Sequence, residues 1–285
     1  NPVPEPPSNP VPEPPSNPVD PVDPVDPVDP VDPIDPIDPI DPVDPVTPTK
    51  PIPSADKLVS YLSLDDGVGK LAKDSSTKGL NNPGTLIGDA DWTQGKKGGA
   101  VTLDGKGDAI RLNNSRDINL GKHKQRTISL WFMTDKINTG KQKQLIYEEG
   151  GGVRGLNVYL DKDQLYVGGW NRPGGKQSKW EGSWLNTNKI SANKWYHVAL
   201  VLDGGSTVAS DAIEGYLNGR SFGSEEGSQL WQHFGGIGLG SINKGTRFHD
   251  GKTPGGGHGL DGKVDNVMIF NDALSTGEVK TLYTT

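Results

Sequence analysis

Cysteine is absent from this chain of 285 residues. A disulfide framework and thiolate metal sites are therefore excluded, which is compatible with a secreted protein that does not rely on oxidation. Long apolar runs are also lacking, because none approaches the ~18–20 residues that span a bilayer. Basic tracts typical of nucleic-acid binding are missing as well. We therefore expect neither a membrane span nor a nucleic-acid partner.

Proline and glycine occupy separate parts of the chain. Of 24 prolines, 21 lie in residues 1–53, whereas all 39 glycines come later. Residues 1–53 also hold eleven acids and one base, Lys50, so they carry a formal charge of −10. The whole chain carries −7, which leaves +3 for residues 54–285. We therefore predict an acidic stalk over residues 1–53 and one domain over residues 54–285, long enough to bury a large core.

The stalk consists of two repeats. The octapeptide NPVPEPPS is written twice, and the tripeptide P-[VI]-D then runs through residues 18–44. Proline at every third position fixes φ near −65° and removes a backbone donor, and the residue before each proline avoids helical conformations. This pattern predicts an extended polyproline II segment. The chain begins within a repeat and without Met, so we expect a processed or truncated part of a longer product.

A repeat of three residues on a helix with three residues per turn keeps each residue type on one face. The aspartates then form one face with a spacing of about 9 Å, and the β-branched residues form another. The β-branched residues, here called the apolar stripe, are Val19, Val22, Val25, Val28, Val31, Ile34, Ile37, Ile40 and Val43.

Two interpretations of the apolar stripe stay open. A stiff spacer needs only proline for extension and aspartate for solubility. It does not need Val or Ile at every third position, so the constancy indicates a face that packs against another stalk or a domain. We expect self-association through the stripe, with a passive spacer as the alternative.

Residues 54–285 show short alternating apolar runs between glycine-rich turns, which predicts β-strands. In TISLWFMT the alternation places Ile128, Leu130 and Phe132 on one face and Trp131 on the other. The segment AIEGYLNGRSFG contains Asn-Gly, the strongest short hairpin signal. Only LSTGEV, near the C-terminus, predicts a helix, through a capping box in which Ser precedes Glu by three residues. The pattern is typical of an antiparallel sandwich.

The domain contains, in this order, LVSYLSLDDGVGKLAKDSS, GKKGGAVTLDGKGDAIRL, RTISLWFMT, NKWYHVALVLDG, GYLNGRSFG, GIGLGSIN and GLDGKVDNVMIFNDALSTGEVKTLY. This series resembles laminin-G-like domains of the concanavalin A-like superfamily over nearly all of residues 56–285. The resemblance implies an all-β fold, a two-sheet antiparallel jelly-roll sandwich. It also implies an extracellular, non-catalytic domain that binds glycans or proteins and often holds one structural calcium ion.

Aspartates suited to calcium gather near both ends of the domain and in LDGKGD. Ca²⁺ prefers carboxylate and carbonyl oxygens as ligands. The resemblance points to Asp265 and the carbonyl of Gly105, with Asp65 or Asp104 as helpers. Aspartate beside glycine is also common in turns, so the alternative is that these residues only shape turns.

The seven tryptophans fall into two groups. The resemblance places Trp92, Trp131 and Trp195 at positions that the family fills with aromatic residues, so we expect them in the core. The others, in polar and glycine-rich segments, are Trp170, Trp180, Trp184 and Trp231.

Exposed aromatic faces suit the apolar face of a pyranose ring, and polar neighbours such as Arg172 and His233 could bond its hydroxyls. We therefore predict a glycan site at these two residues and the second group of tryptophans. One alternative is that long loops bury these tryptophans as satellite clusters. Another is that they face a protein partner, because Trp and Arg anchor many interfaces.

Sequence signals of catalysis are weak. Related jelly-roll glycosidases use the pattern Glu-x-Asp-x-x-Glu, which does not occur here. Glu148 and Glu149 are adjacent, so on a strand they point to opposite faces, whereas glycoside hydrolysis needs paired carboxylates. The motifs G-x-S-x-G and H-E-x-x-H are also missing. We expect no enzymatic activity.

We therefore expect an extracellular or cell-surface protein, a β-sandwich on a polyproline stalk that contributes to a surface fibre or cell-surface assembly. The alternative is a glycan-binding module, lectin-like or carbohydrate-binding, tethered by a passive spacer to an adhesin or a polysaccharide-active enzyme. The first hypothesis predicts assembly that needs the stalk. The second predicts a monomer that binds glycans without it.

Overall fold

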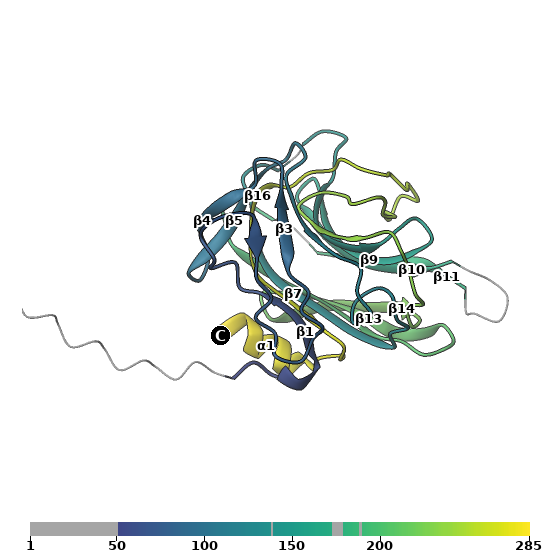
Figure 1. Ribbon diagram of the computed structural model, residues 1–285. Coiled ribbons are helices and arrows are strands. Elements are labelled where there is room, and N and C mark those ends of the chain that lie inside the picture. Colours follow the sequence, from purple (N-terminus) through teal and green to yellow (C-terminus); the bar gives the residue numbers. More distant parts are fainter. Residues whose placement is uncertain (1–50, 138, 173–178, 188–189) are drawn as a thin grey trace, which may run out of the picture. The chain divides into compact units, whose positions relative to one another are not determined.

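The computed structural model describes residues 51–137, 139–172, 179–187 and 190–285. Within them the chain forms two antiparallel β-sheets that face one another, with one short α-helix (Figure 1). This confirms the predicted all-β sandwich. The predicted polyproline segment and the apolar stripe lie outside the described residues.

The chain enters the sandwich through a 3₁₀ turn at Ala55–Lys57 and ends in α1, Thr276–Thr284. The strands are β1 Leu58–Leu62, β2 Leu71–Ala72, β3 Gly84–Ile87, β4 Asp91–Gln94, β5 Gly99–Asp104, β6 Ala109–Leu112, β7 Gln125–Thr134, β8 Gln144–Gly150, β9 Arg154–Asp161, β10 Gln164–Asn171, β11 Trp180–Thr187, β12 Tyr196–Asp203, β13 Ala209–Leu217, β14 Arg220–Gly227, β15 Ile237–Leu239 and β16 Asp261–Phe270.

Each sheet has eight strands. Sheet A has the order β14-β13-β12-β7-β16-β5-β4, and β1 also pairs with β16. Sheet B has the order β11-β10-β9-β8-β15-β6-β3-β2. The first strand thus pairs with the last one, and β13 and β14 form the hairpin predicted around Asn218 and Gly219.

The main core lies between the sheets, where alternate residues of each strand meet. Ile128, Leu130 and Phe132 of β7 are buried there, as their alternation predicts. Trp131 has the opposite orientation and lies on the outer face of sheet A. Trp131 is buried as expected, but against Tyr283 of α1 on this outer face and not between the sheets, and this placement leads directly to the candidate site.

Helix α1 packs on the same outer face, next to β1 (Figure 1). Its Val279 and Leu282 contact Val201 of β12 and Phe270 of β16. The helix begins with the predicted capping box: the Ser275 hydroxyl accepts a hydrogen bond from the Glu278 N–H, and the Glu278 carboxylate accepts one from the Ser275 N–H. In the described part of the chain, no helix has the length and hydropathy needed to cross a bilayer.

Candidate functional site

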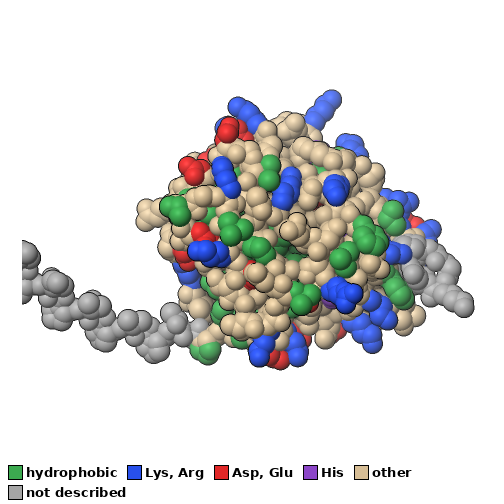
Figure 2. Space-filling view, in the orientation of Figure 1, with side chains coloured by type: hydrophobic (Ala, Val, Ile, Leu, Met, Phe, Trp, Pro, Cys, Tyr) green, Lys and Arg blue, Asp and Glu red, His purple; other side chains and the backbone are tan. Residues whose placement is uncertain are grey.

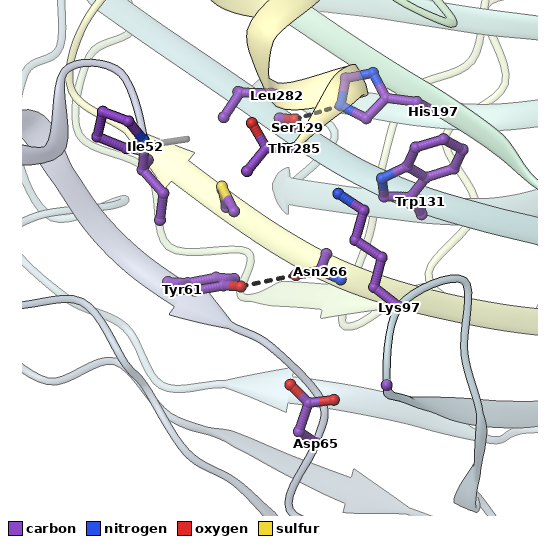
Figure 3. A pocket seen from close by; sticks show the side chains of 13 residues that line it. Ile52, Tyr61, Asp65, Lys97, Ser129, Trp131, His197, Asn266, Leu282 and Thr285 are labelled. Atoms are coloured by element: carbon purple, nitrogen blue, oxygen red, sulfur yellow. Dashed lines mark hydrogen bonds between the residues drawn. The ribbon is translucent and has the colours of Figure 1, made fainter. Parts of the chain in front are cut away.

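The surface in Figure 2 carries scattered basic side chains and small hydrophobic groups, with no broad apolar patch on this face. The candidate site is instead a cavity of about 460 Å³ between the outer face of sheet A, α1 and the turn that joins β4 to β5 (Figure 3). It is lined by Pro51, Ile52, Tyr61, Asp65, Lys97, Gly98, Ser129, Trp131, His197, Asn266, Met268, Leu282 and Thr285.

A β-bulge in β16 shapes the floor of this cavity. The half of β16 before Asp265 pairs with β5, and the half after Asn266 pairs with β1. Between the halves the register against β7 shifts, and Asn266 adopts a φ of 49°. Bulges re-aim side chains, and here Asn266 reaches the cavity (Figure 3).

The buried carboxylate of Asp265 holds the β4–β5 turn against the bulge. One of its oxygens accepts hydrogen bonds from the backbone N–H of Lys96 at 2.8 Å and of Lys97 at 3.0 Å. Asp65, in the segment after β1, holds the same turn, since it accepts a hydrogen bond from the N–H of Gly99 at 2.6 Å. Gly98 sits in this turn at a φ of 62°, and a Cβ there would lie 2.3 Å from the Asp65 carboxylate. Only glycine fits at position 98. The tight turn that this glycine permits presents the Lys97 side chain to the cavity.

Polar side chains meet in two pairs along the cavity (Figure 3). The hydroxyl of Tyr61 donates to Oδ1 of Asn266 at 2.8 Å. The hydroxyl of Ser129 and Nε2 of His197 are 2.9 Å apart. Both pairs can still offer lone pairs or protons to a ligand, because a hydroxyl both donates and accepts.

An aromatic wall closes the cavity on the side of β7. Trp131 stacks on Tyr283 of α1 with ring centroids 5.5 Å apart and meets His197 edge-on at 5.4 Å. The ammonium of Lys96 lies 5.2 Å from the centroid of Trp131. These neighbours cover the ring faces of Trp131, and Figure 3 shows its indole nitrogen turned toward Lys97. The wall therefore offers a ring edge and a hydrogen-bond donor.

Burial shifts the acid–base behaviour of two groups at the site. It raises the pKa of Asp265 to about 6, with a smaller contribution from the nearby charge of Asp65. Burial also lowers the pKa of His197 to about 3, assisted by the positive charge of Lys97. His197 is therefore neutral at pH 7 and adds no charge to the cavity.

The residues predicted from sequence to bind a glycan do not line this cavity. Trp170 and Trp180 are fully buried, and His233, in the loop between β14 and β15, is also buried. These three residues cannot present a surface to a sugar, so their prediction as binding residues was wrong and the alternative of burial holds. Trp184 and Trp231 are partly buried, and Arg172 is exposed.

The same group is also divided between separate contacts. Trp170 stacks on Trp184 with centroids 6.1 Å apart, and Arg172 pairs with Glu181 at 3.2 Å. The carbonyl of Trp231 lies 2.9 Å from Nδ1 of His233. Nε1 of Trp231 and Nε2 of His233 are buried and have no hydrogen-bond partner among the described residues.

The predicted calcium ligands fall into two places. Asp65 and Asp265 flank the β4–β5 turn, whereas Asp104 and Gly105 lie beside Asp261, four residues earlier in β16. Four strand residues span about 13 Å, which separates Asp265 and Asp65 from Gly105 and Asp104, so the pairing of Asp265 with the Gly105 carbonyl is not favoured, and the ligand set stays a prediction. No group of three or more His, Asp or Glu within the described ranges has an arrangement suited to a metal. Calcium binding itself stays a prediction.

Sequence reasoning missed the residues that form the cavity, above all Tyr61, Lys97, His197 and Asn266. One signal was available, because the alternation in β7 and β12 already places Trp131 and His197 on the face opposite the core. The bulge at Asn266 has no comparable signature. The sequence therefore does not predict the cavity, although it places Trp131 of β7 and His197 of β12 on the face where the cavity lies.

Comparison with protein families gives one match. Residues 104–280, more than half of the chain, match the laminin-G-like model described as the concanavalin A-like lectin/glucanases superfamily. A search of curated proteins finds no match.

Among solved structures, the chain is similar to domain 4 of AbnA, an extracellular arabinanase from Geobacillus stearothermophilus, in complex with arabinotriose. That pair shows 21% identity and a TM-score of 0.53, over 80% of this chain and 98% of the other.

A structure of botulinum neurotoxin type C, whose cell entry depends on two ganglioside molecules, shows 14% identity and a TM-score of 0.58 over 81% of this chain. The match spans about half of that structure, 51%. The binding domain of neurotoxin DC in complex with rat synaptotagmin II shows 12% identity and a TM-score of 0.57, over 81% of this chain and 52% of the other. Similarities this remote show a shared fold.

Proposed function

Because the chain belongs to the concanavalin A-like lectin/glucanase superfamily, we propose that it is a non-catalytic glycan-binding module that works outside the cell. The cavity on the outer face of sheet A holds the sugar. The stalk that precedes the domain tethers it to an adhesin or a polysaccharide-active enzyme.

The observation that carries this proposal is the amphipathic lining of the cavity. Ile52, Met268 and Leu282 offer apolar surface to one side of a sugar ring. Tyr61 and Asn266 supply groups that can bond its hydroxyls. A volume of about 460 Å³ lies within the usual range of ligand pockets and exceeds that of one sugar unit.

The structural neighbours support the same class of ligand. The arabinanase domain was solved with an arabinose oligosaccharide, and the entry of neurotoxin type C depends on gangliosides. The arabinanase is also described as extracellular. Two separate proteins of this fold thus use carbohydrate, which favours a glycan over other small ligands for the cavity.

The absence of catalysis is part of the proposal. Ser129 and His197 lie at the distance of a nucleophile and its base, but a working pair needs a third group that orients the base. Nδ1 of His197 has no hydrogen-bond partner in the residues that the structure covers. A pKa of about 3 also makes His197 a poor base at pH 7. We expect no release of sugar from any glycan that binds.

A glycan array with the full chain, followed by titration calorimetry on the best ligand, tests the proposal. Tyr61→Phe keeps the ring and removes the hydroxyl, so it should weaken binding about tenfold through one lost hydrogen bond. Trp131→Ala should weaken binding further because it removes the aromatic wall. Phe234→Ala is the matched control, since Phe234 is 64% exposed and lies outside the cavity.

Thermal unfolding of each variant shows whether a loss of binding reflects a loss of folding. No binding to any glycan would overturn the proposal. So would a folded Tyr61→Phe and a folded Trp131→Ala that both bind like the wild type.

A further inference from the structure

One cationic side chain in the cavity, Lys97, forms no ion pair among the described residues. Lys96 and Lys97 are neighbours in the β4–β5 turn. The backbone N–H of each donates a hydrogen bond to the Asp265 carboxylate, that of Lys97 at 3.0 Å. The backbone of Lys97 is therefore fixed, and its side chain extends across the cavity toward Trp131 and His197 (Figure 3). The ammonium group is presented to whatever occupies the cavity.

No carboxylate within the described ranges lies within ion-pair distance of the Lys97 ammonium, and no hydrogen bond is formed by that group there. Lys97 is nevertheless partly buried, and this burial lowers its pKa, although the nearby charge of Asp265 opposes the shift. A partly buried cation without a direct ion-pair partner is unfavourable, and a negatively charged ligand group in contact with it relieves that cost. A neutral ligand would leave the ammonium without an ion-pair partner.

An acidic side chain lies beside the same turn. Asp65 is exposed and bonds the N–H of Gly99 through one carboxylate oxygen, so its other oxygen can accept hydrogen bonds from ligand hydroxyls. In Figure 3 Asp65 and Lys97 approach the cavity from different segments, and Tyr61 lies beyond Asn266 as seen from Lys97. The cavity thus combines a cation, a hydrogen-bond acceptor and apolar surface.

From this arrangement we infer that the cavity prefers an anionic sugar, one that carries a carboxylate or sulfate group beside its hydroxyls. The charged group pairs with the Lys97 ammonium, and a hydroxyl of the same sugar bonds Asp65. This inference rests on the proposed glycan-binding function and names its ligand class.

Calorimetric titration of the full chain with three trisaccharides tests the inference: one of galacturonic acid, one of sulfated galactose and one of neutral galactose. At low salt, one or both anionic ligands should bind about tenfold or more tightly than the neutral one, the expected effect of a charged hydrogen bond. The two anionic probes distinguish a carboxylate from a sulfate. Because the Lys97 pairing is electrostatic, the preference should shrink as salt is added.

Lys97→Gln should remove most of the anionic preference and leave affinity for the neutral trisaccharide nearly unchanged. Lys97→Arg should retain the preference because it retains the charge. Lys106→Gln is the matched control, since it removes the same charge from another exposed turn outside the cavity. It should bind like the wild type.

Equal binding of all three trisaccharides would overturn the inference while the glycan-binding function stands. An anionic preference that survives in Lys97→Gln and disappears in Lys106→Gln would place the charge recognition elsewhere and also overturn it. A chain that binds no glycan on the array or in these titrations would overturn the proposed function itself.

Discussion

Replacing Asp265 with Asn should change the pH dependence of stability in a defined direction. Burial raises the pKa of Asp265 to about 6 in the folded chain, whereas an unfolded aspartate has a pKa of about 3.9. Between these values the folded chain holds more protons at this site than the unfolded chain does. The free energy of unfolding contributed by Asp265 therefore falls as the pH rises from about 4 to about 6.

The size of the effect follows from the difference of about two pKa units. Each unit corresponds to 1.36 kcal/mol, so charged Asp265 costs the fold about 3 kcal/mol above pH 6. Asp265→Asn does not titrate. Its free energy of unfolding, relative to the wild type, should therefore be about 2 kcal/mol higher at pH 7 than at pH 4, because the unfolded aspartate is already about half ionised at pH 4. Changes in hydrogen bonding at the turn affect both pH values alike and cancel in this difference.

Urea unfolding of both chains at several pH values between 4 and 7 measures the effect. Other titrating groups, including the buried histidines, are common to both chains and drop out of the comparison. Glu226→Gln, at an exposed strand position, controls for the loss of one negative charge. A difference between Asp265→Asn and the wild type that stays constant over this range would refute the reasoning.

Three further predictions concern stability, calcium and assembly. Arg126 and Glu149 form a fully buried ion pair with 3.5 Å between Nε and Oε1, so Glu149→Ala should lower the free energy of unfolding in urea by about 3–5 kcal/mol. The double variant Arg126→Met, Glu149→Gln should lose less stability than the sum of the losses in the two single variants. Strict additivity of the two losses would contradict the pairing. If calcium binds at Asp265, the melting temperature should be higher in calcium than in chelator, and Asp265→Asn should abolish that difference; equal melting temperatures of the wild type would overturn the calcium prediction. Sedimentation velocity of the full chain should show large species that disappear when all nine residues of the apolar stripe become Ser, whereas identical profiles would favour a passive spacer.

Local patterns predicted much of the fold because they depend on neighbouring residues alone. The alternation in β7 assigned Ile128 and Leu130 to the core, and Asn218-Gly219 marked the turn between β13 and β14. The capping box located the start of α1. Each of these signals has a direct steric or hydrogen-bonding cause within a few residues.

The tryptophan prediction failed for an instructive physical reason. Segments such as VGGW were interpreted as exposed loops because they are rich in glycine, but they are paired strands. A Cβ on Gly168 would lie 2.0 Å from the ring of Trp184, and one on Gly169 would lie 2.5 Å from the ring of Trp180. The glycines thus make room for tryptophan rings on neighbouring strands. Only the strand register shows that these residues meet.

The cavity was beyond sequence analysis because it combines distant segments. Tyr61, Lys97, Trp131 and Asn266 come from β1, the β4–β5 turn, β7 and β16, and α1 closes the space above them. Alternation could place Trp131 on the outer face, but it could not show that α1 packs there. The bulge that turns Asn266 inward depends on β16 changing neighbours from β5 to β1.

The most direct test of the account follows the tryptophan indole N–H resonances by NMR while the best array glycan is added. The resonance of Trp131 is identified by its loss in Trp131→Phe. The account predicts that the Trp131 resonance shifts as the glycan concentration rises, because its indole nitrogen faces the cavity. The resonances of the buried Trp170 and Trp180 should stay where they are. Shifts at Trp184 or Trp231 with Trp131 unchanged would contradict the account and place the sugar on another surface of the sandwich.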